Sequence, residues 1–378
     1  MVQNQNWRNL NRRIRLSKPN LQNQNLITLF NKLLDTGFLV QGRYVKQFER
    51  EIANYLGAKH AIAVSSGTAA LHLSLAALGI GPKDEVIVPA YTFPATVNVV
   101  ELVGAKPILV DVEMDTYNIK VADIERAISQ NTKAIIPVHL FGNPADIKSI
   151  MEIAGKYNLW VIEDAAGALG STYKGGKCGT FGIVGCFSFH PRKIITTGEG
   201  GMIVTNDDNL AERLRELRNH GMKTMNSYND FFMPGFNYRM SEIEAIFGLT
   251  QFSKIQEIID ERQKLAKLYT EFLEDIPEIT FQKVLRNCMS VWQAFVIRFR
   301  DRIIYDILNT LNKAGVEVSV GTYAIHLLKF YREKYGFQPL DYPHATKLYF
   351  TNLAIPFYNG ITLDEMKNVV NMLRTVIS

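Results

Sequence analysis

The sequence is poor in cysteine, because the 378 residues include only Cys178, Cys186 and Cys288. An odd number of cysteines at wide spacing supports neither a disulfide framework nor a zinc cluster, and it is typical of a reducing cytosol. Hydrophobic residues make up 47% of the chain and charged residues 21%. Both values are ordinary for a globular enzyme, so they exclude wholesale disorder, and the length predicts two domains or one large domain with a smaller one.

Long apolar runs are also missing. No stretch reaches the ~18–20 apolar residues that a membrane-spanning helix needs, which excludes an integral membrane protein. The first residues lack the apolar stretch and the small-residue cleavage site of a secretory signal. We therefore expect a cytoplasmic protein without a membrane partner.

The net charge of +5 does not spread over the chain. Residues 1–20 contain no acid and five basic residues, and removing these five from the total of 42 leaves 37, which match the 37 acidic residues. A short basic arm can bind nucleic acid. Because no recognition helix, zinc finger or RNA-binding sheet accompanies it, we favour a solvated arm that packs on a partner subunit and expect no nucleic acid.

From about residue 57, short apolar strands alternate with helical stretches. The predicted strands are His60–Ser65, Glu85–Pro89, Lys106–Asp111, Lys133–Val138 and Leu159–Glu163. The predicted helices between them are Ala69–Leu78, Ala95–Val103, Val121–Ser129 and Ile147–Tyr157. Continuous apolar strands joined through helices are typical of an α/β domain with a parallel sheet that is covered on both faces.

After Asn206 this alternation ends. The pattern predicts helices over Asp207–Asn219 and Ser241–Leu273, the second long and interrupted. It then predicts a smaller α+β domain with strands Val291–Arg298 and Glu317–Gly321 and helices Arg302–Ala314 and Leu363–Ile377. We therefore divide the chain into a basic arm (1–20), a large α/β domain (21–255) and a small α+β domain (256–378).

The usual nucleotide motifs are absent, since the chain has neither a Walker loop nor a G-x-G-x-x-G fingerprint. A different small-residue turn, Ser65–Ala70 (SSGTAA), joins a predicted strand to a predicted helix. Backbone N–H groups at a helix start and the positive end of the helix dipole suit a phosphate. Taken alone, the turn is better explained as a plain glycine turn with a serine or threonine cap.

Two further clusters carry reactive side chains. Glu163 and Asp164 end a predicted strand, where ligands of parallel sheets bind, although Asp164 could instead cap a helix. Lys193 follows the apolar stretch Phe187–Phe189 in a loop of small residues. A crowded lysine of this kind can become a nucleophile, although most lysines after a strand are surface residues.

Together the three clusters match one cofactor. Pyridoxal phosphate needs N–H and hydroxyl donors for its phosphate, a carboxylate for its pyridine nitrogen, and a lysine that forms a Schiff base with its aldehyde. The chain supplies Ser65–Ala70, Asp164 and Lys193 in that order. We expect no metal.

The chain also resembles the DegT/DnrJ-type sugar aminotransferases, which are fold-type I pyridoxal phosphate enzymes. The resemblance runs from about residue 14 to the C-terminus. It rests on these segments: Ser65–Ala70, Asp84–Thr92 (DEVIVPAYT), Glu163–Ala166 (EDAA), Phe187–Lys193 (FSFHPRK), Thr196–Gly201 (TTGEGG), Gly235–Met240 (GFNYRM) and Pro356–Tyr358 (PFY). It implies a three-layer domain with a mainly parallel sheet, followed by the smaller α+β domain.

Position by position, the resemblance implies that Lys193 binds the cofactor covalently and moves the proton, and that Asp164 pairs with the ring nitrogen. The cofactor-binding residues that it implies are Gly67, Thr68, Ala69, Phe93, Asp164, Ala166, Ser188, Lys193 and Asn237. Phe93 would stack on the cofactor, and Asn237 would reach the phosphate of the neighbouring subunit in a homodimer with shared active sites. The implied substrate contacts are His190, His326 and Arg239.

Two positions depart from the family pattern. The family commonly has Gln or His three residues after the aspartate, near the ring hydroxyl of the cofactor, and this chain has Gly167. That contact must therefore come from water, the substrate or another side chain. In the small domain, the segment Gly321–His326 replaces a commoner version that contains Tyr-Pro, so His326 is a substrate contact or a structural histidine.

The implied reaction moves an amino group from an amino acid, expected to be L-glutamate, to a nucleotide-linked keto-sugar with ping-pong kinetics. His190 in the SFHP stretch favours C4 of a 4-keto-6-deoxy sugar over C3. Family members that dehydrate sugars replace the lysine with histidine, which Lys193 argues against. From another class of function, a cofactor-binding regulator with a DNA-binding arm stays an alternative.

Overall fold

The computed structural model describes residues 13–21, 25–225 and 228–377. Its centre is a sheet of seven strands in the order β1-β10-β9-β6-β5-β2-β4. These strands are β1 (His60–Val64), β2 (Glu85–Pro89), β4 (Lys106–Val110), β5 (Thr132–Ile135), β6 (Trp160–Asp164), β9 (Val184–Ser188) and β10 (Gly201–Thr205). None of the helices in the described ranges combines the length and apolar character that a membrane-spanning helix needs.

All strands of the sheet run in parallel except β10, which pairs antiparallel with both β1 and β9. The connection between β9 and β10, residues 189–200, contains no helix that would carry the chain across a face of the sheet, as the crossover between parallel strands usually does. The carboxyl ends of β1, β2, β6 and β9 therefore lie along one edge. The connection between β9 and β10 (residues 189–200, here called the lysine loop because it contains Lys193) lies at the same edge.

The strands carry apolar side chains on both faces. In β1, Ile62 and Val64 lie in one core, while Ala61 and Ala63 lie in the core on the opposite face. This alternation follows from the two-residue period of a strand. It explains why the strands read as continuous apolar runs.

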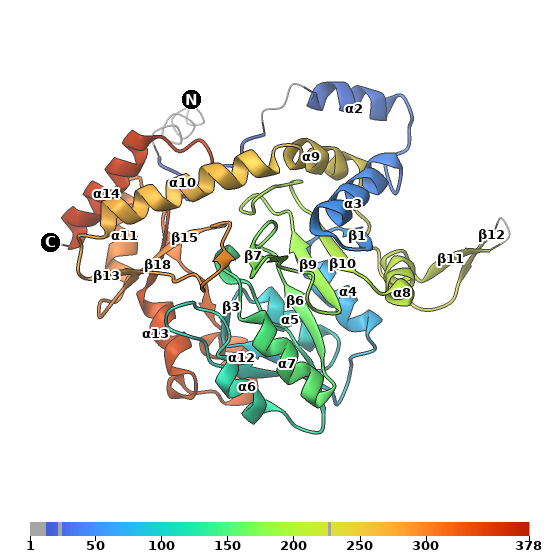
Figure 1. Ribbon diagram of the computed structural model, residues 1–378, viewed down its shortest axis with the longest axis horizontal. Helices are drawn as coiled ribbons and strands as arrows, with labels where there is room; N and C mark the ends of the chain where they lie inside the picture. Colours follow the sequence, from blue (N-terminus) through green and yellow to red (C-terminus); the bar gives the residue numbers. More distant parts are fainter. Residues whose placement is uncertain (1–12, 22–24, 226–227, 378) are drawn as a thin grey trace, which may run out of the picture.

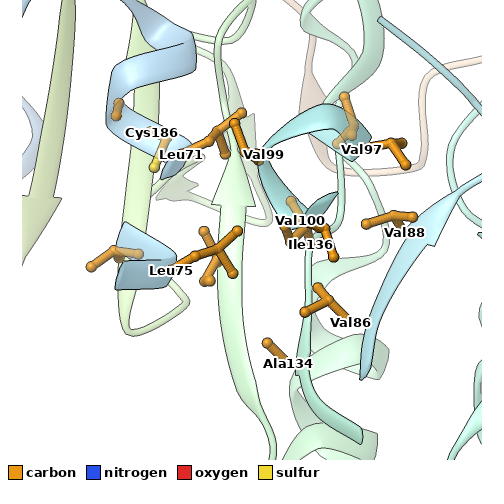
Figure 2. Close-up of a cluster of buried hydrophobic side chains, with 14 of the residues drawn as sticks. Leu71, Leu75, Val86, Val88, Val97, Val99, Val100, Ala134, Ile136 and Cys186 are labelled. Carbon is orange, nitrogen blue, oxygen red and sulfur yellow. The ribbon is translucent and has the colours of Figure 1, made fainter. Parts of the chain in front are cut away.

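Helices cover both faces of this sheet (Figure 1). The helices that pack in the first core are α4 (Gly67–Ala77), α5 (Ala95–Leu102) and α8 (Asp208–Arg218). Those that pack in the second are α3 (Arg43–Leu56), α6 (Val121–Ala127), α7 (Ile147–Tyr157) and α9 (Glu242–Phe252). Figure 2 shows Leu71 and Leu75 of α4 and Val99 and Val100 of α5 in the first core. The domain thus has the three layers that the sequence predicts.

The C-terminal part is a smaller α+β unit. Its antiparallel sheet consists of β13 (Ile279–Phe281), β15 (Phe295–Phe299), β18 (Asn352–Ile355) and β16 (Ser319–Val320), in that order. The helices that share its core are α10 (Ile255–Leu273), α11 (Tyr305–Lys313) and α14 (Leu363–Ile377). The strand that we expected from Val291 begins only at Phe295, because Trp292 has a left-handed backbone, with a φ of 50°.

Three features join the two parts. Helix α10 packs Ile255 and Ile259 in a core of the large part and Tyr269 and Leu273 in the core of the small one. Strand β3 (Tyr91–Thr92) pairs with β17 (Tyr323–Ala324), and β14 (Cys288–Met289) pairs with β7 (Thr172–Tyr173), which also pairs with β8 (Gly176–Lys177). Helices α12 (Lys329–Tyr335) and α13 (Pro343–Thr351) pack on the first core. The small part therefore forms a wall above the carboxyl edge of the sheet.

The described end of the basic arm packs on its own chain. Ile14 donates its N–H to the carbonyl of Gly315 (2.9 Å) and accepts from the N–H of Glu317 (2.9 Å). Leu16 donates to Oε2 of Glu317 (3.1 Å) and accepts from the N–H of Phe357 (3.0 Å). Hydrogen bonds to the small part thus hold Ile14 and Leu16, and Arg8 and Arg12 lie outside the described residues.

Besides α3, α12 and α13, two elements near the molecular surface were not predicted. Helix α2 (Leu26–Leu34) exposes Ile27 and Leu34. The hairpin of β11 (Met222–Met225) and β12 (Tyr228–Phe231) projects from the body of the molecule (Figure 1).

Candidate active site

A cavity of about 600 Å³ opens at the carboxyl edge of the sheet, between the large part and the small one. The sequence-predicted residues that line it are Gly67, Thr68, Phe93, Asp164, Ala166, Ser188, His190 and Lys193. They come from four places in the fold: the start of α4, the segment after β3, the end of β6 and the β9–β10 connection. Residues more than 100 positions apart in the sequence therefore share one cavity, as ligand sites of parallel sheets do.

The start of α4 borders one end of the cavity. The side chain of Ser66 caps the helix by accepting from the N–H of Ala69 (3.0 Å). This leaves the N–H groups of Gly67 and Thr68 at the helix start, where the helix dipole favours an anion. Ala69, which we also expected to bind the phosphate, uses its N–H for the cap and is absent from the described residues that line the cavity.

Glycine at position 67 lets the helix start approach the end of β9. A Cβ atom there would lie 2.7 Å from Cβ of Ser188, closer than side chains pack. Because Gly67 has none, the Ser188 hydroxyl lies beside the free N–H groups of the helix. Position 67 thus requires glycine for space, and the result is a small pocket of hydrogen-bond donors.

Asp164 lies at the end of β6 and is 5% exposed. Its Oδ2 accepts from the hydroxyl of Thr96 (2.8 Å), and its Oδ1 accepts from the N–H of Ala166 (3.1 Å). The Thr96 hydroxyl is also 3.0 Å from that of Thr92. These contacts orient the carboxylate toward the cavity and leave it able to accept a further hydrogen bond.

The neighbouring acid points the other way, because successive strand residues face opposite sides. Glu163 is fully buried and accepts from the N–H groups of Gly179 (2.8 Å), Phe181 (2.6 Å) and Gly182 (2.8 Å). Nε2 of His139 adds a fourth contact at 2.9 Å. Of the two adjacent acids, Asp164 therefore serves the cavity and Glu163 holds the loop at 179–182.

Lys193 lies on the connection between β9 and β10. The N–H of Lys193 donates to the carbonyl of His190 (2.8 Å), and the N–H of Phe189 donates to the carbonyl of Gly200 (2.9 Å), so the loop is a closed turn. Burial lowers the pKa of Lys193 below the ordinary value for lysine, and Asp164 partly opposes this shift. An amine that loses its proton more readily is a better nucleophile and base.

His190 lines the cavity three residues before the lysine. Its Nδ1 accepts from the N–H of Arg192 (3.2 Å), which leaves the proton of the neutral ring on Nε2. Burial lowers the pKa of His190, so the neutral form is favoured. Phe93 is 62% exposed at the cavity rim, and its ring lies 6.3 Å from that of Tyr323 between centroids.

Besides Ala69, three predicted residues are absent from the described residues that line the cavity. His326 is fully buried, bonds through Nε2 to the hydroxyl of Thr346 (2.8 Å) and has a pKa lowered to about 4 by burial. Its Nδ1 is buried and has no hydrogen-bond partner among the described residues. Arg239 donates to Oδ1 of Asn219 (2.6 Å), and Asn237 is exposed near the base of the β11–β12 hairpin.

Sequence reasoning missed several lining residues. Thr96 holds Asp164, and Gln293, Ser319 and Thr322 contribute polar groups from the small part. Leu16 lines the cavity because of the backbone pairing of the N-terminal segment. Thr96 lies four residues after Thr92 at the start of α5, in the same segment of the sequence as the predicted Phe93. The positions of the others depend on how the small part packs.

The residues fit pyridoxal phosphate. The uncapped N–H groups of α4 and the Ser188 hydroxyl suit a phosphate, the oriented carboxylate of Asp164 suits a protonated ring nitrogen, and the amine of Lys193 suits an aldehyde. The space between these three groups is open. Within the ranges that the structure describes, no group of three or more acidic, cysteine or histidine side chains is arranged to hold a metal ion.

Comparison with known proteins identifies the family. The pattern of the DegT/DnrJ/EryC1/StrS aminotransferase family matches residues 20–374. A protein named GDP-perosamine synthase from Caulobacter vibrioides is 38% identical, over 97% of this chain and 98% of that one. Helicobacter pylori PseC, described as an aminotransferase involved in the biosynthesis of pseudoaminic acid, superposes with a TM-score of 0.90, at 28% identity, over 96% of this chain and 99% of that one.

Spr1654 from Streptococcus pneumoniae, solved in a PLP-form, superposes with a TM-score of 0.91 at 28% identity, over 96% of this chain and 98% of that one. The family match covers nearly the whole chain, and the three-layer fold and the cofactor that the sequence predicted are confirmed. The chain belongs to the DegT/DnrJ/EryC1/StrS aminotransferase family and is a pyridoxal phosphate-dependent aminotransferase.

Proposed function

We propose that this enzyme transfers an amino group from L-glutamate to a nucleotide-linked keto-sugar, at C4 of a 4-keto-6-deoxy sugar. The observation that carries the proposal is the cavity itself. Lys193, Asp164 and the open start of α4 meet at its floor, and its opposite wall is formed by the small part and the N-terminal segment. The curated relative named GDP-perosamine synthase makes a GDP-linked sugar the first candidate acceptor.

Pyridoxal phosphate, when bound, supplies an aldehyde for amine capture and a ring that accepts electrons. Lys193 provides the amine for covalent attachment and, once released, the base and acid that move the proton. Because burial lowers its pKa, the amine is ready to accept that proton at lower pH than an ordinary lysine. Asp164, fixed by Thr96, holds positive charge at the ring nitrogen.

The opposite wall suits a sugar. Ser319 and Thr322 bring hydroxyl and backbone groups from the small part, while Leu16 and Phe357 add apolar surface. Hydroxyls can exchange hydrogen bonds with sugar hydroxyls, and apolar side chains can cover a 6-deoxy carbon. His190, which presents a neutral ring three residues before Lys193, lies where it can influence which sugar carbon meets the amine.

The ring position can be tested with matched 3-keto and 4-keto nucleotide sugars, both offered as GDP-linked and other nucleotide-linked forms. With glutamate as donor, we expect the visible absorbance of the bound cofactor to fall on adding glutamate and to return on adding the 4-keto sugar. NMR of the product should show the new amine at C4. Turnover of the 3-keto sugar alone would contradict amination at C4 and assign it to C3. An absorbance spectrum that no amino donor changes would favour the alternative of a cofactor-binding regulator.

We further propose a homodimer with shared active sites. Asn237 is exposed and lies outside the set of described residues that line its own cavity, although the family resemblance assigns it to the phosphate. The projecting β11–β12 hairpin next to it exposes Tyr228 and Phe231, and α2 exposes Ile27 and Leu34. Exposed apolar side chains on projecting elements are typical of an interaction surface. A partner that covers them would receive Asn237 in its cavity.

Subunit mixing tests this assembly. Lys193→Ala and Asn237→Ala homodimers are each expected to lose most activity. In a mixed dimer, the subunit that keeps Lys193 would receive Asn237 from the other, which restores one intact site. Activity recovered on mixing, together with a dimer mass in sedimentation, is the expected result. No recovery, or a fully active monomer, would contradict the shared site.

A further inference from the structure

Gln293 enters the cavity from the small part and is attached to the large part at two points. Its backbone N–H donates to the carbonyl of Phe141 (2.9 Å), and its side-chain Nε2 donates to the carbonyl of Arg192 (2.8 Å), the residue directly before Lys193. The side chain therefore spans from the small part to the lysine loop. An amide nitrogen carries two N–H groups, and only one of them is needed for Arg192.

The same side chain fills the space over Gly167, which also lines the cavity. A Cβ atom at position 167 would lie 3.2 Å from Oε1, 3.4 Å from Cγ and 3.5 Å from Cβ of Gln293. Gly167 has no left-handed φ, so its backbone would accept any residue. The tight space, not the backbone conformation, is therefore what favours glycine there, and Gln293 creates that condition.

The backbone that carries Gln293 is held in an unusual way. The preceding residue, Trp292, has a left-handed φ of 50°, which is rare for a bulky residue. The guanidinium of Arg262, itself 4% exposed, donates from Nη1 to the carbonyls of Trp292 (3.0 Å) and Gln293 (3.2 Å). Its Nε donates to Oδ1 of Asn359 (2.9 Å). A strained residue and a buried cation together fix the backbone that carries Gln293, and backbone strain of this kind is found at functional sites.

The covalent structure of the cofactor indicates what this amide meets. In the pyridine ring, the C3 oxygen lies on the edge between the nitrogen and the aldehyde-bearing C4, away from the phosphate arm on C5. Gln293 lies between Gly167, three residues after Asp164, and Arg192, next to Lys193. Gly167 thus follows Asp164, the expected partner of the ring nitrogen, and Arg192 precedes Lys193, the expected partner of the aldehyde on C4.

We propose that Gln293 donates its second amide N–H to the C3 oxygen of bound pyridoxal phosphate while it holds the lysine loop through Arg192. It thereby supplies, from the small part, a polar side chain that position 167 lacks. The inference deepens the cofactor site on which the proposed function rests, but it depends on no sugar.

The first test follows the visible absorbance band of the cofactor-loaded enzyme as a function of pH, without donor or acceptor. A hydrogen bond to the charged C3 oxygen favours the deprotonated side of this titration. Gln293→Ala and the near-isosteric Gln293→Met should therefore raise the midpoint by about one unit, a tenfold change in the proton equilibrium. Gln256→Ala, which removes an exposed glutamine bonded to Asp260 on α10, should leave it unchanged.

A midpoint that stays at the wild-type value in both Gln293 variants would overturn the contact with the C3 oxygen. The result is separable from the proposed function: a shifted midpoint without sugar turnover refutes only the substrate, and turnover without a shift refutes only the role of Gln293. Gln293→Met keeps the volume of the side chain, so it reports on the donor even where Gln293→Ala loosens the loop.

The second test addresses the space over Gly167 in the full-length protein without cofactor. Gly167→Gln should lower the thermal unfolding midpoint in the wild-type background, because its Cβ meets Gln293. In the Gln293→Ala background, Gly167→Gln should lower the thermal unfolding midpoint much less, since the space is then free. Residues in contact give such non-additive effects, and strictly additive midpoints would overturn the assignment of this space to Gln293.

Discussion

Lys193→Ala is expected to reduce the catalytic rate by about 10⁴-fold or more while the protein still binds pyridoxal phosphate. Removal of a general acid–base alone costs about 10²–10⁴-fold, and this variant also loses the amine for covalent attachment. Binding should persist because the start of α4, Ser188 and Asp164 remain. Steady-state kinetics and an equilibrium binding assay with the cofactor measure the two effects separately.

Borohydride reduction followed by peptide mapping identifies the attachment point. The lysine to compare is Lys177, whose pKa is also lowered by burial and whose Nζ lies 4.4 Å from the ring centre of Tyr55, but which is absent from the described residues lining the cavity. We expect the label on Lys193 and wild-type activity for Lys177→Ala. A label on any other lysine would refute the assignment.

The lowered pKa of Lys193 also has a consequence for pH. The neutral amine forms as pH rises through this pKa, so recapture of the cofactor by the cofactor-free enzyme should speed up with pH. It should then level off below the pH at which an ordinary lysine would become neutral. Stopped-flow absorbance across the pH range measures this, and a rate that still climbs at the ordinary lysine pKa would contradict the buried environment.

Asp164→Asn is expected to keep the fold and to lose about 100-fold or more of the activity. An adjacent carboxylate shifts the pKa of a cationic partner by about 1–3 units, so its loss lowers the ratio of protonated to neutral ring nitrogen by about 10–1000-fold at a given pH. The fold should survive, because an asparagine Oδ1 can still accept from the N–H of Ala166. Its Nδ2 can donate to Thr96, whose hydroxyl can turn toward Thr92.

Glu163→Gln is the matched control, since it changes the adjacent carboxylate on the opposite face of β6. Its oxygens accept from three backbone N–H groups and from His139, so an amide nitrogen would face a donor. We expect a loss of about 1–3 kcal/mol in the free energy of unfolding, with the cofactor absorbance spectrum retained. Near-wild-type activity of Asp164→Asn, or a loss of the cofactor spectrum only in Glu163→Gln, would reverse the roles of the two acids.

The sequence alone determined the features that depend on neighbouring residues. The continuous apolar runs of the strands and the helices between them predicted the layered α/β domain, because each strand must bury both faces. Glycine and serine before α4, an acid at the end of β6 and a lysine after β9 predicted the cofactor, because ligands of parallel sheets bind at the carboxyl edge.

The tertiary structure decided what depends on distant packing. It showed that β10 returns antiparallel and that His326 is buried and bonded to the hydroxyl of Thr346. It also brought Thr96 to Asp164 and Gln293 to the lysine loop. Thr96 and Asp164 lie 68 positions apart within the large part, and Gln293 and Arg192 lie 101 positions apart in different parts. No local pattern fixes such distances, so only the tertiary packing of these segments brings each pair together.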